Sequence, residues 1–308
     1  MLHMPGVRSS VARMDRGPLA QEIITAFDGM PPQIRSAARY VLDRPRDVAL
    51  LSMREQSRHA GVKPATMTRL AKHLGYDGYE QIRRQYAAAV RSGDIGFAGK
   101  VGSQIASQKL EGDRALVQEM LEMAGTHLAS LAAGQIDRIL AVAERLHSAR
   151  RVYSLGLRSS HAAAWQLHYI LSLIGERSYL LDGIAGTGPD ALRGATDEDV
   201  LLSVSIAPYT RHTVELARHA ARRGIRVLTI TDSEVAPLAA IAEAAVIVPT
   251  GSPSFFHTMM PACMIAEILG ALVAGRQGEA ALQAMRRTDR YFADLNIHST
   301  TRNGAKAR

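Results

Sequence analysis

The second half of this sequence alternates short apolar runs with amphipathic stretches, and this alternation restricts the fold more than any other feature. Strands are expected at 151–155, 178–181, 200–205, 227–231 and 245–248. Helices are expected at 160–174, 210–223 and 259–273. Strands that alternate with helices form a parallel sheet covered on both faces. The sequence therefore predicts a three-layer α/β body. Residues 113–147 indicate two more helices, which pack on this body or on a partner subunit.

The first 92 residues predict a different architecture, made only of helices. Apolar stripes at helical spacing, bounded by prolines and glycines, indicate helices at 19–27, 32–44, 52–60, 64–74 and 79–91. Ser52 and Glu55 have the spacing of a capping box, and Gly61 suits a left-handed turn. Two short helices around such a turn form a helix-turn-helix unit, expected at Met53–Leu74.

Positive charge is concentrated in this helical head. Residues 1–92 hold 15 Lys and Arg against 8 Asp and Glu, whereas residues 93–308 hold 22 against 21. A basic segment joined to a nearly neutral remainder indicates either a polyanion partner for the head or a solvated basic surface. The helix-turn-helix pattern favours the polyanion, and double-stranded DNA is the expected partner.

The second helix of the unit is expected to present a polar face to the DNA major groove. Arginine can bind guanine with two hydrogen bonds, threonine offers a hydroxyl and a methyl, and lysine neutralises phosphate. Thr66, Thr68 and Arg69 are the predicted base contacts. Lys63 and Lys72 are predicted to bind phosphates, and His73 completes the face.

The head also resembles a known family of regulators. Residues 32–85, with VKPATMTRLAKHLGYDGYEQIRRQ at their centre, resemble the N-terminal domain of RpiR/MurR transcriptional regulators. Lys63 departs from the serine or threonine often found at its position, so the usual capping hydroxyl is missing. Gln56 also departs from the pattern, since it occupies a position where an apolar residue usually packs.

Two turns of the body follow strands and precede helices, as anion-binding turns do. The first is GLRSS at 156–160, and the second is SVSIAPYT at 203–210. Serine hydroxyls and free amides at a helix N-terminus favour an anion. Both turns are expected at the carboxyl edge of the sheet, where ligands bind in such folds.

Residues 128–275 resemble the sugar isomerase (SIS) domain, which follows the head in RpiR/MurR regulators. The resemblance implies a sensor of a phosphorylated sugar, with Ser159, Ser205 and Thr210 as phosphate-contacting hydroxyls and Ser160 beside them. Ala207 and Pro208 replace a serine and a glycine of the family's second turn, which removes a hydroxyl and a backbone N–H from the anion site. Arg158 or Arg211 could supply the missing charge. The effector is therefore either a phosphosugar held differently or another small acid or polyol.

Two other functions remain open from the sequence. His257 and Glu267 flank the start of the last helix, and in sugar isomerases of this fold a histidine and a glutamate move protons between carbons. A sugar-phosphate isomerase with an accessory DNA-binding domain is thus one alternative. A DNA-binding architectural protein whose body only forms oligomers is the other. The preferred interpretation is a regulator rather than an enzyme, without catalytic residues or a cofactor.

The domain organisation follows from these patterns. We expect a disordered basic leader at 1–17, the head at 18–92, a linker at 93–112, the SIS domain at 113–290 and a loose tail at 291–308. The single cysteine, Cys263, fits a reducing cytoplasm. Neither a metal site nor a membrane span is expected. A homodimer or homotetramer is expected, because one head offers few base contacts.

Overall fold

The computed structural model describes residues 18–91, 97–182 and 187–298, and the predicted leader at 1–17 lies outside them. The body is built on a five-stranded sheet with the order β2-β1-β3-β4-β5, and all its strands are parallel. The strands are β1 (Val152–Leu155), β2 (Ser178–Leu180), β3 (Val200–Ser205), β4 (Arg226–Thr231) and β5 (Ala244–Ile247). The predicted parallel α/β body is confirmed.

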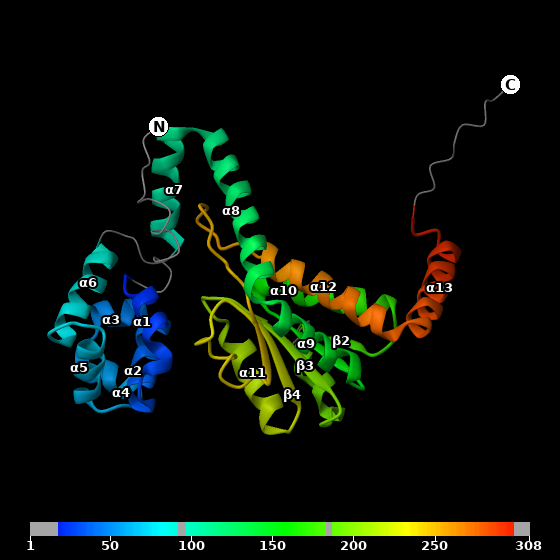
Figure 1. The fold of residues 1–308 in the computed structure, drawn as a ribbon, viewed down its shortest axis with the longest axis horizontal. Helices are drawn as coiled ribbons and strands as arrows, with labels where there is room; N and C mark the ends of the chain where they lie inside the picture. The colour runs from blue at the N-terminus through cyan, green and yellow to red at the C-terminus, as the bar shows by residue number, and fades with distance from the viewer. Residues whose placement is uncertain (1–17, 92–96, 183–186, 299–308) are drawn as a thin grey trace.

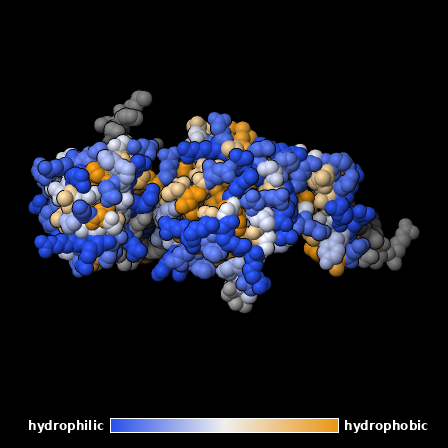
Figure 2. Space-filling model, turned by 90° about the horizontal axis from the view of Figure 1, so that it is seen from below, coloured by the Kyte–Doolittle hydropathy of each residue, from blue (hydrophilic) through white to orange (hydrophobic). Residues whose placement is uncertain are grey.

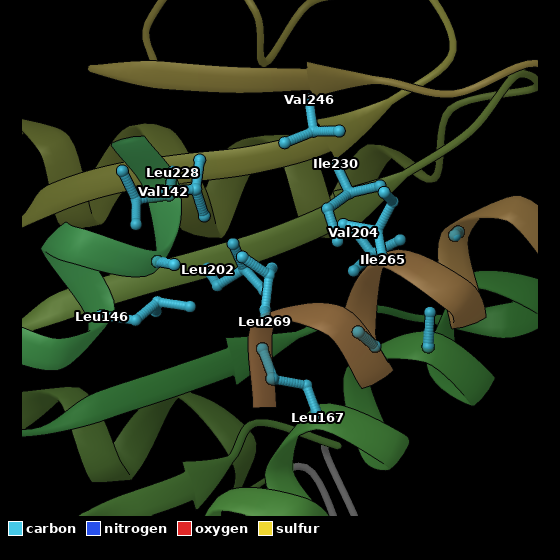
Figure 3. Packing of buried hydrophobic residues seen from close by; sticks show 14 of the residues in the cluster. Val142, Leu146, Leu167, Leu202, Val204, Leu228, Ile230, Val246, Ile265 and Leu269 are labelled. Atoms are coloured by element: carbon cyan, nitrogen blue, oxygen red, sulfur yellow. The ribbon is translucent and has the colours of Figure 1, made fainter. Parts of the chain in front are cut away.

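Helices cover both faces of this sheet (Figure 1). One face is covered by α9 (Ile136–Ser148), α10 (His161–Leu173) and α12 (Met260–Gln277). The other face is covered by α11 (Arg211–Arg222) and the 3-10 helix η4 (Gly188–Gly194). Every residue of β1 and β3 is buried, as continuous apolar strands between two helical layers should be. Figure 3 shows Leu202 and Ile230 of the sheet facing Leu269 and Ile265 of α12.

The head consists only of helices, as predicted. They are α1 (Ala20–Ala26), η1 (Phe27–Gly29), α2 (Pro32–Asp43), α3 (Pro45–Leu50), α4 (Met53–His59), α5 (Pro64–His73) and α6 (Tyr79–Arg91). Helix α3 was not predicted: Pro45 ends α2 and also occupies the first turn of α3, where a missing N–H does no harm. The buried cluster of the head also includes Val235 of the body, so the two parts are in contact.

The predicted helix-turn-helix unit is present as α4, a short turn and α5. The capping box of α4 is complete, because Ser52 accepts from the N–H of Glu55 and the Glu55 carboxylate accepts from the N–H of Ser52. Gly61 has a φ of +67°, the left-handed conformation predicted for the turn. Met67 and Leu70 are fully buried between the helices.

A hairpin of two long helices joins the head to the sheet (Figure 1). We call this hairpin the arm; it consists of α7 (Phe97–Glu111) and α8 (Asp113–Gly134). The segment 93–112, predicted as a linker, is therefore helical over most of its length. Glycine weakens a helix by about 1 kcal/mol but does not forbid one, and α7 packs along α8.

The C-terminal region departs from the predicted tail. Helix α13 (Glu279–Asp294) packs on α10 and α12, so the first four residues of the expected tail at 291–308 are helical. No helix among the described residues is long and apolar enough to cross a membrane.

Candidate DNA-binding surface and ligand site

Helix α5 presents most of its predicted DNA-facing side chains to solvent. Lys63, Arg69, Lys72 and His73 are exposed, and Thr68 is half-buried. Lys63 is the N-cap residue of α5 and makes no side-chain capping bond. Pro64 has no N–H and the Thr66 N–H donates to the Lys63 carbonyl at 2.8 Å, so the Ala65 amide is the group at this positive helix end that suits a phosphate oxygen.

Thr66 has a different place from the one the sequence suggested. Its side chain is only 1% exposed, and its hydroxyl oxygen accepts a hydrogen bond from Arg69 Nη2 at 3.1 Å. Thr66 as a base contact stays a prediction. In the structure its hydroxyl engages the guanidinium of the exposed Arg69 and lines the same hollow as that arginine.

A hollow lies at the turn between α4 and α5, and the sequence analysis found only part of its lining. Its lining includes Gln33, Arg58, Gly61, Lys63 and Arg69. Arg58 is exposed, and no motif identifies it, because its neighbourhood depends on how α2, α4 and α5 pack. Figure 2 views the molecule from below, and the head at its left is mainly hydrophilic there. Three cations around one hollow suit a polyanion.

The two predicted anion-binding turns lie side by side in the body. The chain leaves β1 toward β2 on one side and leaves β3 toward β4 on the other, so the strand order reverses between β1 and β3. In open α/β sheets ligands bind at this switch point, outside the carboxyl ends of the strands. The turns after β1 and β3, at 156–160 and 206–210, both open there.

The first turn requires its glycine. A Cβ on Gly156 would lie 2.5 Å from the carbonyl oxygen of Ser160, which no real side chain tolerates. Arg158 has a φ of +56°, uncommon for a residue other than glycine, and strain of this kind gathers at ligand sites. Ser159 is half-buried and Ser160 is buried at the N-terminus of α10.

The second turn places one predicted hydroxyl in the interior and one at the edge. Ser205 is 2% exposed, and its Oγ has no hydrogen-bond partner among the described residues. Thr210 is half-buried at the N-cap of α11, without a side-chain capping bond. The Thr210 hydroxyl therefore lies at the edge of the turn, whereas the unpartnered Ser205 hydroxyl is enclosed beneath it.

Asp232 is a site residue that the sequence analysis missed. Its carboxylate accepts the backbone N–H of Ala207 at 3.4 Å, so an amide of the second turn is already engaged by an acidic group. A carboxylate repels a phosphate but accepts hydrogen bonds from sugar hydroxyls. Only the pairing of β3 with β4 brings this residue beside Ala207.

The two arginines considered as replacement cations differ in their surroundings. The Arg211 side chain is 90% exposed and donates to Glu215 at 2.6 Å, which lowers the pKa of the Glu215 carboxyl. It is thus held along its own helix. Arg158 is exposed within the first turn itself, so it is the better placed of the two.

His257, which the sequence analysis considered only for the isomerase alternative, lies beside the first turn of the candidate ligand site. It is 6% exposed, and its Nε2 lies 2.9 Å from the hydroxyl of Ser159. Glu267 is exposed on α12 and accepts from Gln166 of α10 at 2.6 Å. The described residues contain no cluster of side chains that could hold a metal ion.

Comparison with known proteins agrees with this architecture. Residues 145–271 match the family model of the SIS domain. An uncharacterized HTH-type transcriptional regulator of Clostridium perfringens is 22% identical over 188 residues, 59% of this chain and 64% of that protein. The match thus spans less than two thirds of this relative. The uncharacterized HTH-type transcriptional regulator YfhH of Escherichia coli is 24% identical over 215 residues, 67% of this chain and 72% of that protein.

Solved structures share the fold of this chain. The sugar isomerase domain of an RpiR transcription factor from Sphaerobacter thermophilus is 29% identical, with a TM-score of 0.53 over 56% of this chain and 97% of that one. The NanR protein of Vibrio vulnificus, complexed with ManNAc-6P, is 19% identical, with a TM-score of 0.54 over 90% of this chain and 98% of that one. The predicted resemblance of the body to the SIS domain is confirmed.

Proposed function

We propose that this chain, a helix-turn-helix head joined to a SIS body, is a DNA-binding transcription regulator whose body binds a phosphorylated sugar or related small carbohydrate and thereby controls operator binding. The relatives support the first half of this proposal, since both are HTH-type transcriptional regulators. The observation that carries it is the exposed cationic face of α5 at the end of a complete helix-turn-helix unit.

The ligand half of the proposal rests on the site at the switch point. Ser159, Ser205 and Thr210 stand on two adjacent turns, and the Ser205 hydroxyl has no partner among the described residues. Asp232 adds an acceptor for a sugar hydroxyl. NanR, which shares the fold, is complexed with ManNAc-6P, and this makes a phosphorylated amino sugar the first ligand to test.

The isomerase alternative has less support. An isomerase needs an acid and a base that flank the same carbons of the substrate. Here His257 is engaged with Ser159, whereas Glu267 lies on an exposed face and is bound by Gln166. We therefore propose a sensor without catalytic residues.

The proposed regulator acts on its operator in the cytoplasm as a homodimer or homotetramer. One recognition helix makes few base contacts, and two heads on a pseudo-palindromic site reach useful affinity. The arm supports association, because Val117 and Leu121 of α8 are 56% and 69% exposed. Light scattering during size-exclusion chromatography measures this state.

A DNA titration tests the proposed function. The full chain is titrated against duplex DNA from upstream of its own gene at about physiological salt, with and without a panel of sugar phosphates that includes ManNAc-6P. Sequence-selective binding that one of these compounds shifts is the expected result. Selective binding that no ligand shifts would favour the architectural protein. The titration could instead show only sequence-blind binding, and a genome-wide binding search could then find no selective site either. If, in addition, the chain turns over a sugar phosphate and Glu267→Gln abolishes this turnover, the chain is an isomerase.

A further inference from the structure

The segment between β5 and α12 touches both the ligand site and the arm. We call residues 249–258 the bridging loop. At one end, His257 is buried against the first ligand-binding turn, where its Nε2 meets Ser159 Oγ at 2.9 Å. Figure 1 shows this loop, in yellow-brown, rising from the body between α7 and α8.

The other side of the bridging loop is held by the arm. The backbone N–H of Phe255 donates to Gln104 Oε1 of α7 at 2.9 Å. Gly251 lies against α8, because a Cβ built on it would meet the sulfur of Met123 at 3.8 Å and Nε2 of His127 at 3.9 Å. The loop therefore contacts both helices of the arm.

Internal hydrogen bonds make the bridging loop a connected unit. Ser252 Oγ accepts from the N–H of Ser254 at 3.1 Å, and Ser254 Oγ accepts from the N–H of Phe256 at 3.3 Å. The Phe256 ring stacks on the His257 ring, with centroids 4.4 Å apart. These contacts connect His257 with the neighbouring residues 252–256 of the bridging loop.

The arm leads directly to the DNA-binding head. Helix α6 of the head ends at Arg91, and α7 begins at Phe97. Gln104 lies in the middle of α7, about two helical turns from its start.

We propose that the bridging loop transmits the state of the ligand site to the arm, through Ser159, His257, Phe255 and Gln104. The inference rests on the proposed function, because it assigns the regulation of that site. A ligand that engages the Ser159 hydroxyl competes with His257 for it, and the loop then changes its hold on α7. The ligand changes the position of the head only if it binds one arrangement of the bridging loop and α7 more tightly than the other.

Spatial connection alone does not establish energetic coupling, so the test is a double-mutant cycle. Hydrogen exchange of the full chain is followed by mass spectrometry in Ser159→Ala, Gln104→Leu and the double variant. Each single variant should speed exchange of the α7 amides at 97–111 several-fold, and the double variant should exchange no faster than either one. Gln104→Glu keeps the acceptor oxygen and should behave like the parent chain.

Two further variants serve as controls in this test. Gln118→Ala removes an exposed glutamine of α8 and should leave α7 unchanged. If Ser159→Ala loses the unfolding transition reported by Trp165, His257→Asn replaces it in the cycle. The proposal is overturned if the Ser159 variant changes exchange only at 156–160 and 249–258, or if the two effects on α7 add.

Failure of the proposed function gives a different result. Addition of ManNAc-6P or inorganic phosphate should slow exchange at 156–160 and 206–210. If neither compound does so, the site does not bind phosphate and the phosphorylated-sugar ligand is wrong. The exchange measurements on the variants are made without ligand. They therefore still decide whether the bridging loop couples the ligand site to the arm.

Discussion

The hydroxyl of Tyr79 donates to the side-chain oxygen of Gln56 at 2.6 Å, in the interior of the head. Gln56 is fully buried, and its Nε2 donates to the carbonyl oxygens of Leu51 at 2.8 Å and Val48 at 3.1 Å. A position expected to be apolar thus holds a satisfied polar network that ties α3 and α6 to α4. Burial raises the pKa of Tyr79, so its hydroxyl stays a donor.

We expect Gln56→Leu to destabilise the head by about 1–3 kcal/mol for each buried group that it leaves unsatisfied. Tyr79→Phe removes only the donor and should have a smaller effect. Trp165, the single tryptophan, reports unfolding of the body by fluorescence, whereas circular dichroism reports both parts. We expect the unfolding transition seen by circular dichroism to shift to lower denaturant concentration, and the transition seen by fluorescence to stay unchanged. A Gln56→Leu head as stable as the parent would contradict the network.

Arg69→Ala should weaken selective DNA binding by about 1–3 kcal/mol, if this arginine binds a base edge. Thr66→Val removes the acceptor that orients Arg69 and should cost less. Arg84 is exposed on α6, and Arg84→Ala removes the same charge away from α5. Fluorescence anisotropy with operator and scrambled duplexes compares the three variants. Equal losses for Arg69→Ala and Arg84→Ala on both duplexes would show that charge alone matters.

Gly156→Ala should weaken ligand binding about tenfold or more while the sheet stays folded, because its Cβ would collide with the Ser160 carbonyl. Displacement of even one hydrogen-bonding group of the site reduces affinity about tenfold. Gly175→Ala is the matched control, since nothing lies within 4 Å of a Cβ there. Calorimetric titration with the sugar phosphate that shifts DNA binding measures both variants. Wild-type affinity in Gly156→Ala would place the ligand elsewhere.

The body should lose stability as the pH falls below about 6.5, the ordinary pKa of histidine. Burial lowers the pKa of His168, although the charge of Asp182 partly opposes this shift, and burial also lowers the pKa of His127. The unfolded chain therefore binds more protons than the folded chain, so the stability present above this pH is lost as the pH drops toward the folded pKa.

Thermal unfolding followed by Trp165 fluorescence between about pH 5 and pH 8 measures this loss. His168→Gln should flatten the profile, since it removes one of the two groups. His219→Gln, on an exposed position of α11, should leave it unchanged. If the melting temperature of the parent chain rises on acidification, His168 and His127 do not cause a loss of stability at low pH.

Local patterns in the sequence determined the two-part architecture. The alternation of strands and helices after Arg150 predicted the parallel sheet, and Ser52, Glu55 and Gly61 predicted α4 and its turn. Such features depend on neighbours within a few residues, so periodicity and capping chemistry are enough to find them. The ligand-binding turns were found for the same reason, because each is a short glycine- or serine-bearing segment after a strand.

Contacts between distant segments were decided only by the tertiary structure. His257 meets Ser159 across 98 positions of sequence, and Asp232 reaches Ala207 only because β4 lies beside β3. Thr66 was expected at the surface, but it is buried and its hydroxyl accepts from Arg69. Helix α7 formed despite its glycines because α8 packs along it. In each case the free energy comes from packing between separate elements, which local propensity does not contain.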